Sequence, residues 1–124
     1  MKNALSWFEI PVNDLERAKK FYSTVLDIEI TDMPLDGVPW KYALFPYDQD
    51  GGIGGTLVKG EGYVPNSTGS VVYLNGNGSL SQILAKVEKA GGKVVLPRTP
   101  IGPYGFFAQF TDSEGNKVAI HSPD

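Results

Sequence analysis

The stretch 6-SWFEIPVNDLERAKKFYSTVL-26 joins a strand directly to an amphipathic helix. In its first part the apolar residues Phe8, Ile10 and Val12 alternate with Trp7, Glu9 and Pro11, as in a strand with one buried face. Asn13 or Asp14 is the expected N-cap of the helix, in which apolar residues recur on one side as far as Leu26. The stretch therefore predicts a strand that packs beneath the helix following it.

The rest of the chain continues this pattern and then repeats it. Three short strands are expected next, at 28–32, 40–45 and 53–58. A loop at 59–68 follows them. The second half begins with a strand at 70–74 and a helix at 80–90. Ser79 and Gln82 have the spacing of a capping box at the start of this helix, and Gly91-Gly92 is expected to end it. Its last strands are expected at 93–96, 105–111 and 116–122. The order predicts an α+β fold in which one domain, 1–124, contains two βαβββ modules, 1–60 and 69–124.

Composition restricts the classes of function. The apolar content of 41% and the charged content of 20% are ordinary for a globular protein, and no apolar run approaches the length of a membrane span. A net charge of −3 argues against nucleic acid as a partner. The chain has no cysteine, and its N-terminal segment lacks an apolar signal core, so a cytoplasmic protein is expected.

Strand alternation assigns each side chain to one of two faces. The inner face, beneath the helices, is uniformly apolar, whereas the outer face mixes aromatic with polar side chains. The outer face is expected to contain Trp7, Glu9, Tyr73, Phe107, Gln109 and His121. Large aromatic groups with a few polar groups are typical of a small-molecule pocket, and a solvated sheet face is the alternative.

Two outer-face residues are candidates for acid–base chemistry. Glu9 is expected to be desolvated between Trp7 and Pro11, which suits proton abstraction or hydrogen bonding to a ligand; a structural carboxylate is the alternative. His121 is the only histidine and has a suitable imidazole, unless it belongs to a fraying C-terminal tail. Tyr104 and Trp40 are candidates for the pocket rim, and a packed surface turn is equally compatible with Tyr104.

Three segments resemble the vicinal oxygen chelate superfamily, which includes glyoxalase I, bleomycin-resistance proteins and extradiol dioxygenases. They are 10-IPVNDLERAKKFYSTVL-26, 85-AKVEKAGGKVV-95 and 104-YGFFAQFTDSEGNKVAI-120, with Ser113 where the family turn has proline. Together they cover nearly the whole chain in the right order. The resemblance implies paired βαβββ modules forming a half-open barrel around a cavity, and commonly a homodimer.

The resemblance also implies four strand positions for the ligands of a divalent metal. The matching residues in this chain are Trp7, Thr56, Val71 or Val72, and Ala119. None of them is a usual metal ligand. We therefore expect no metal and no cofactor at this site.

The resulting hypothesis is a metal-free member of the superfamily that binds a small, partly apolar molecule. Its expected ligand contacts are Trp7, Trp40, Thr56, Tyr73, Tyr104, Phe107 and Gln109. The alternative is a glyoxalase-type lyase or isomerase using Glu9 as acid or base, with or without a non-standard metal site; His121 is the second catalytic candidate. A structural protein without a ligand is a third possibility. No nucleic acid and no membrane partner is expected.

Overall fold

The computed structural model describes residues 3–78 and 80–123, and the expected order of elements occurs in it twice. The first half consists of β1 (Trp7–Pro11), α1 (Leu15–Leu26), β2 (Thr31–Asp32), β3 (Lys41–Leu44) and β4 (Gly54–Lys59). The second half consists of β5 (Tyr73–Asn75), α2 (Leu80–Val87), β6 (Lys93–Pro100), a 3₁₀ turn (Gly102–Tyr104), β7 (Phe106–Thr111) and β8 (Lys117–Ser122). The α+β class and the paired βαβββ arrangement are confirmed.

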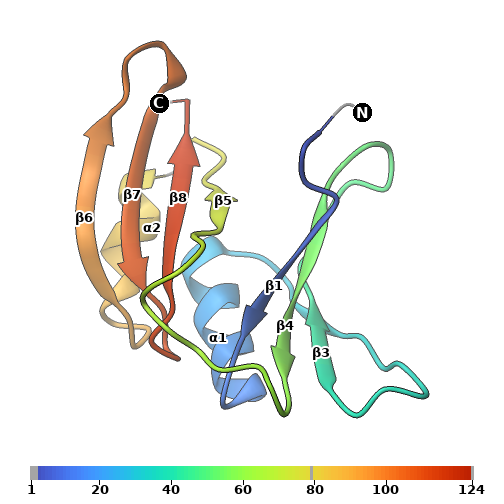
Figure 1. Ribbon diagram of the computed structural model, residues 1–124. Helices are drawn as coiled ribbons and strands as arrows, with labels where there is room; N and C mark the ends of the chain where they lie inside the picture. Colours follow the sequence, from blue (N-terminus) through green and yellow to red (C-terminus); the bar gives the residue numbers. More distant parts are fainter. Residues whose placement is uncertain (1–2, 79, 124) are drawn as a thin grey trace.

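The strands form two four-stranded sheets. Their orders are β1-β4-β3-β2 and β5-β8-β7-β6. In each sheet the first strand of the module pairs in parallel with the last, and the other pairs are antiparallel. Within the described residues no strand of one sheet pairs with the other, so the two sheets do not close into a barrel (Figure 1). β1 and β5 are edge strands that border the gap.

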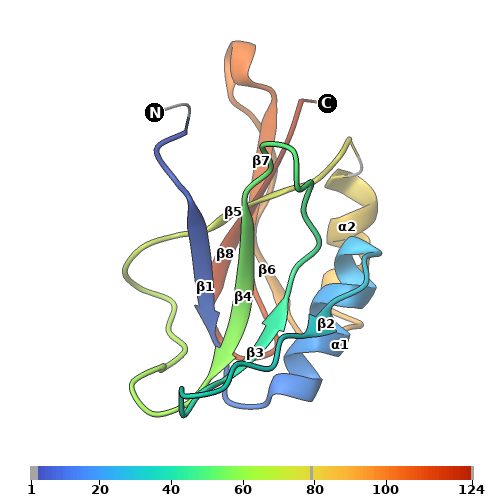
Figure 2. The ribbon, with the colours of Figure 1, turned by 90° about the vertical axis from the view of Figure 1, so that its right-hand side faces the viewer.

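Both helices lie on the same side of the two sheets (Figure 2). α1 packs on β3 and β4, α2 packs on β6, β7 and β8, and the helices contact each other. The inner faces and the helices share one buried core, which includes Ile10, Phe21, Tyr22, Leu57, Leu80, Val87, Phe110 and Ile120. The outer faces of both sheets point away from this core. Neither helix in the described part of the chain has the length and apolar content needed to cross a bilayer.

α1 begins after Asp14, one of the two N-caps that the sequence predicts. Asp14 has an extended backbone, and its Oδ1 accepts a hydrogen bond from the backbone N–H of Arg17 at 3.0 Å. The helix ends at Asp27, which adopts a left-handed conformation with φ of 54°. Phe21 and Tyr22 are completely buried, and each such side chain contributes about 1.5–3 kcal/mol to folding.

α2 is shorter than the 80–90 predicted, because it ends at Val87 and continues as turns. The backbone N–H of Gly92 bonds to the carbonyl of Val87 at 2.9 Å, and Gly91 has φ of 109°. A Cβ at Gly92 would lie 2.4 Å from the carbonyl oxygen of Thr111, so the chain passes too close to β7 for any side chain. Ser79, the expected cap, lies outside the described residues.

Three strands differ from the prediction by more than one residue at an end. β6 extends to Pro100 rather than ending at Leu96, pairing with β7 across two irregularities in register. It is an edge strand, where the missing N–H of proline is tolerated, so Pro97 does not end it. The strands expected at 28–32 and 70–74 begin three residues later, as β2 and β5, and β5 continues to Asn75, which pairs with His121.

The turn between β7 and β8 connects the two modules. Asn116 donates from its side-chain amide to the carbonyl of Pro11 at 2.8 Å and accepts from the backbone N–H of Asn66 at 3.0 Å. The buried hydroxyl of Tyr22 in α1 donates to Asp112 at 2.5 Å. The start of this turn is thus bonded to α1, and its end to the last residue of β1.

Glu114, in the middle of the same turn, completes the N-terminus of α1. Its Oε1 accepts from the backbone N–H groups of Asn13 and Asp14, both at 2.9 Å, and its carboxylate binds the guanidinium of Arg17 at 2.7 and 2.9 Å. Burial opposes ionisation, but the bonds from Arg17, the backbone and Ser113 outweigh it and lower the pKa of Glu114 to about 2. The carboxylate is therefore an anion at the positive end of the helix.

Candidate functional site

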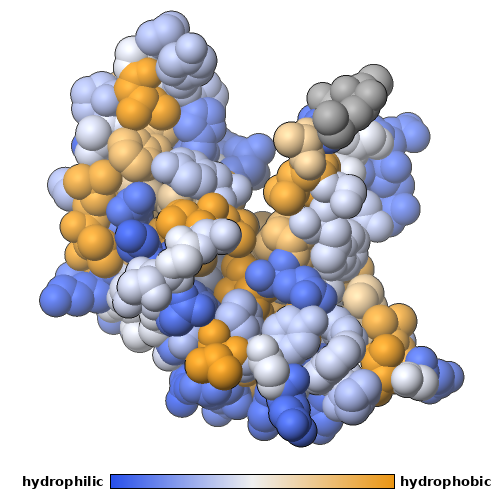
Figure 3. Space-filling view, in the orientation of Figure 1, coloured by the Kyte–Doolittle hydropathy of each residue, from blue (hydrophilic) through white to orange (hydrophobic). Residues whose placement is uncertain are grey.

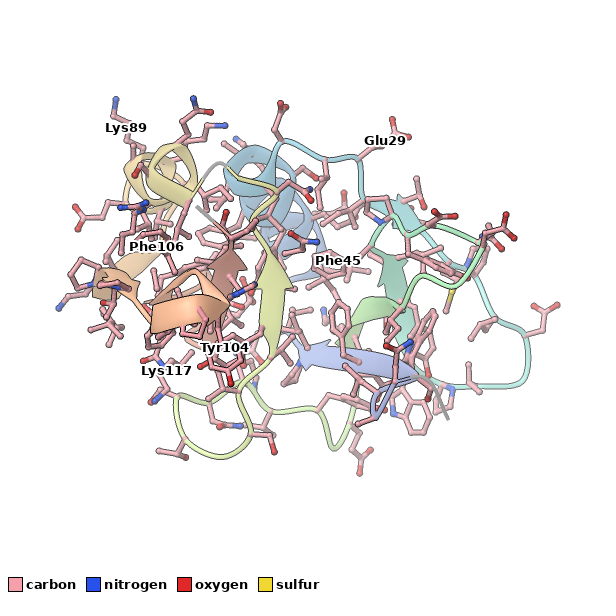
Figure 4. All side chains as sticks on the ribbon, turned by 90° about the horizontal axis from the view of Figure 1, so that it is seen from above. Glu29, Phe45, Lys89, Tyr104, Phe106 and Lys117 are labelled. Atoms are coloured by element: carbon pink, nitrogen blue, oxygen red, sulfur yellow. The ribbon has the colours of Figure 1, made fainter. Side chains whose placement is uncertain are left out.

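The structure confirms which strand side chains face the helices and which face away. Inner-face residues such as Ile10, Ala108 and Val118 are buried, whereas Trp7 and Tyr73 on the outer face are 37% and 55% exposed. Seen from above, Phe45 lies between sheet and helices, while Tyr104 and Lys117 lie on the opposite side (Figure 4). The alternation in the sequence was sufficient for this division because the side-chain period of a strand is fixed.

Glu9 lies at the middle of the outer face of β1, in register with Thr56 of β4. Its side chain is exposed, so the desolvation expected from the sequence is not found. The hydroxyl of Tyr63, in the connection between β4 and β5, donates to Oε1 of Glu9 at 2.8 Å. This hydrogen bond raises the pKa of Tyr63, because a phenolate would lose the bond and repel the carboxylate.

Trp40 joins this group through Tyr63. The two rings pack edge to face with centroids 5.5 Å apart, and the indole N–H of Trp40 donates to the carbonyl of Glu61 at 3.1 Å. A Cβ at Gly60 would lie 2.0 Å from Trp40 Cδ1, so the glycine provides the space for the indole. Tyr63 is the residue that sequence reasoning missed, because it belongs to a loop without periodicity.

Thr56 has a buried polar atom without a partner. The residue is fully buried between Glu9 of β1 and Leu44 of β3, and its hydroxyl forms no hydrogen bond with the described residues. An unpaired buried hydroxyl costs roughly 1–3 kcal/mol. Such a cost indicates either a tolerated defect or a role in binding.

The second sheet carries the other predicted residues on its outer face. Tyr73 and Phe107 stack with ring centroids 6.2 Å apart, and Gln109 is in register with Ala119. His121 is in register with Phe107 and is half-buried in β8, so it is not part of a frayed tail. Its Nε2 lies 2.6 Å from the carbonyl oxygen of Tyr104. Because a carbonyl only accepts, Nε2 carries the proton, and only Nδ1 is available as a base.

The predicted residues thus form two groups rather than one pocket. Trp7, Glu9, Thr56 and Trp40 gather at the first sheet, and Tyr73, Tyr104, Phe107, Gln109 and His121 at the second. Trp40 and Tyr104, expected to form a common rim, belong to different groups. Glu9 and His121 lie on separate sheets.

The side chains at the four implied metal positions do not fit a divalent ion. Trp7 offers only an N–H donor, the side chains of Val71, Val72 and Ala119 have no donor atom, and the hydroxyl of Thr56 is buried. No group of three or more His, Asp or Glu side chains within residues 3–78 and 80–123 could coordinate a metal. The donor set of this chain therefore differs from the metal-dependent pattern.

A notch of about 740 Å³ opens between the two modules and is visible as the hollow at the top of the space-filling view (Figure 3). Its apolar lining includes Phe8, Phe45, Leu74 and Ile83; its polar lining includes Asp48, Asn75, Asn77, Gln82 and Lys86. Of the predicted contacts only Tyr73 lines it. The other lining residues come from strands, helices and loops of both modules. Which of them meet depends on how the two sheets are placed, so no local pattern in the sequence predicts them.

Comparisons with known proteins agree with this architecture. The family model of the Glyoxalase/Bleomycin resistance protein/Dioxygenase superfamily matches residues 4–120. A glyoxylase-like domain-containing protein of Didymella fabae is 33% identical over 120 residues, covering 94% of this chain and 91% of that protein.

Two solved structures share the fold over nearly their whole length. Hypothetical protein SA1046 of S. aureus has a TM-score of 0.67 at 25% identity, covering 98% of both chains. A glyoxalase/bleomycin resistance protein of Albidiferax ferrireducens T118 has a TM-score of 0.70 at 19% identity, covering 97% of this chain and 98% of that one. The chain therefore belongs to the glyoxalase/bleomycin resistance protein/dioxygenase superfamily.

Proposed function

We propose that this protein binds a small, partly apolar organic molecule in the notch between its two sheets, without a metal. The proposal rests on the notch, because the notch volume of about 740 Å³ is within the range found for binding sites of small organic ligands. Core residues such as Phe8, Phe45 and Ile83 provide an apolar surface, and Asn75, Gln82 and other polar residues provide hydrogen-bonding groups. This combination suits a ligand with an apolar body and a few polar groups.

The acid–base alternative loses its main support in this structure. Desolvation of Glu9 would favour this chemistry, whereas Glu9 is exposed and accepts a hydrogen bond from Tyr63. His121 is on the other sheet and uses Nε2 for the carbonyl of Tyr104. Neither residue lines the notch.

The test uses N-phenyl-1-naphthylamine, a neutral apolar dye whose fluorescence rises on leaving water. Gln82→Trp adds bulk at the edge of the notch, and Ser81→Trp adds the same bulk at the next, exposed position of α2, outside the lining. We expect saturable binding that Gln82→Trp weakens by about tenfold or more, whereas Ser81→Trp changes it by less than about twofold. Absence of saturable binding, or equal effects of the two substitutions, would contradict the proposal.

A further inference from the structure

The carboxylate of Glu9 has no cationic partner in the described part of the chain. Its one hydrogen bond is the bond from the Tyr63 hydroxyl at 2.8 Å, and the ion pairs of the described residues involve other carboxylates. The side chain is exposed, so its charge is accessible from outside. Tyr63 is neutral with a raised pKa, and it orients the carboxylate without neutralising it.

One aromatic ring contacts this carboxylate, and another is its neighbour on the same face of β1. Trp7 is two residues earlier on the same face of β1, and its ring packs edge-on against Tyr47 with centroids 6.1 Å apart. Tyr63 contacts the carboxylate and packs against Trp40. A negative charge beside electron-rich rings is the arrangement by which proteins recognise ammonium groups.

Two glycines of this region make room for the rings. A Cβ at Gly54 would lie 2.7 Å from Tyr47 and 3.0 Å from Trp7, and a Cβ at Gly60 would lie 2.0 Å from Trp40. Both aromatic pairs therefore depend on the absence of a side chain beneath them. Rings that are fixed in this way lose little freedom when a ligand contacts them.

We infer that Glu9, Trp7 and the Tyr63–Trp40 pair form a site for a small organic cation bearing a substituted ammonium group. The site is on the outer face of the first sheet, whereas the notch is lined by the inner-face neighbour Phe8. None of its four residues lines the notch, although Tyr47, on which Trp7 packs, borders both. The two sites therefore adjoin without sharing a residue named here, and either can fail without the other. The net charge of −3 attracts cations to the molecule as a whole.

The experiment compares choline with 3,3-dimethyl-1-butanol, an alcohol of the same shape in which carbon replaces the charged nitrogen. The chain has two tryptophans, so two indole N–H signals in ¹H–¹⁵N spectra of the full chain report on the site directly. We expect choline to shift both signals saturably, with an affinity about tenfold or more above that of the alcohol. Equal affinity for the two compounds, or no shift with choline, would overturn the inference.

Two substitutions distinguish the effect of the Glu9 carboxylate on choline binding from the effect of net charge. Glu9→Gln retains an acceptor for Tyr63 and is expected to weaken choline binding by about tenfold while leaving alcohol binding unchanged. Glu29→Gln removes the same charge at an exposed position on the helix side of the molecule (Figure 4), and we expect a change below about twofold. Equal losses in the two variants would attribute the effect to net charge and contradict the site.

A further variant keeps the test decisive if Glu9→Gln does not fold. Trp7→Leu removes an exposed ring and leaves the indole of Trp40 as the reporter. It is expected to weaken choline binding more than alcohol binding, and equal weakening would contradict the inference. Gln82→Trp in the notch is expected to leave choline binding unchanged.

Discussion

At the scale of single residues, alternation along a strand decides which face a side chain occupies. This is why Trp7, Glu9 and Tyr73 are on the outer face as predicted. Alternation does not decide exposure: Thr56 and Ala119 have the same outer orientation, yet both are fully buried. They are in central positions of their sheets, where long neighbouring side chains cover a short one.

Thr56 provides the residue-scale prediction. Thr56→Val replaces the unpaired hydroxyl by a methyl group of nearly the same shape, so the free energy of unfolding is expected to rise by about 1 kcal/mol. Urea unfolding followed by circular dichroism measures this change. As a control, Thr24→Val on the exposed side of α1 should change stability by less than about 0.5 kcal/mol. Destabilisation of the Thr56→Val variant would show that the hydroxyl has a favourable partner.

At the scale of elements, α1 depends on two caps of different origin. Asp14 is the local cap, and a residue of this type before an amphipathic helix is recognisable in the sequence. Glu114 is the distant one, 97 residues from its partner Arg17. The turn that contains Glu114 is recognisable in the sequence as a family feature, but its contacts are not, because they depend on the packing of one module on the other.

The Glu114 contacts predict an acid-sensitive stability. Because the pKa of Glu114 is lowered to about 2 in the folded chain, its contribution is fully present above the unfolded pKa. It is lost as the pH falls from about 5 to 2. The contribution of Glu114 to the free energy of unfolding is at most about 3 kcal/mol. Solvent screening reduces this value, because Arg17 is half-exposed.

Glu114→Gln is therefore expected to lower stability at neutral pH and to flatten its dependence on pH between about 5 and 2. Chemical unfolding at several pH values measures the slope. Glu16→Gln, which removes an exposed carboxylate of α1, should leave the slope nearly unchanged. A slope of wild-type steepness in Glu114→Gln would show that other carboxylates control the acid response.

At the scale of the whole molecule, the two sheets leave surfaces that usually have a partner. β1 and β5 each have one edge that pairs with no strand among the described residues. These free edges border the gap between the modules (Figure 1). Exposed large apolar residues occur on both modules: Leu5, Trp7, Leu35, Val38, Val64, Tyr73, Val95 and Tyr104. A free strand edge can pair with a second chain, which is consistent with the homodimer implied by the family resemblance.

We therefore expect a dimer with a mass of twice 13.4 kDa in sedimentation velocity experiments. Association should persist when the protein is diluted from about 100 to about 1 µM, as for a specific complex of moderate affinity. A single species of 13.4 kDa throughout this range would contradict the expectation. The wild-type chain in high salt is the appropriate control, since apolar contacts are weakened little by salt.

The sequence by itself determined the two βαβββ modules, their inner and outer faces, a cap at Asn13 or Asp14 and the lack of metal-binding side chains at the four implied positions. These features depend on residue type and on periods of two or 3.6 residues, which are local. The tertiary structure decided that Tyr63 reaches Glu9 across 54 positions and that Glu114 reaches Arg17 across 97. It also decided that a notch separates the sheets, because their placement results from core packing shared by both modules and not from any local pattern.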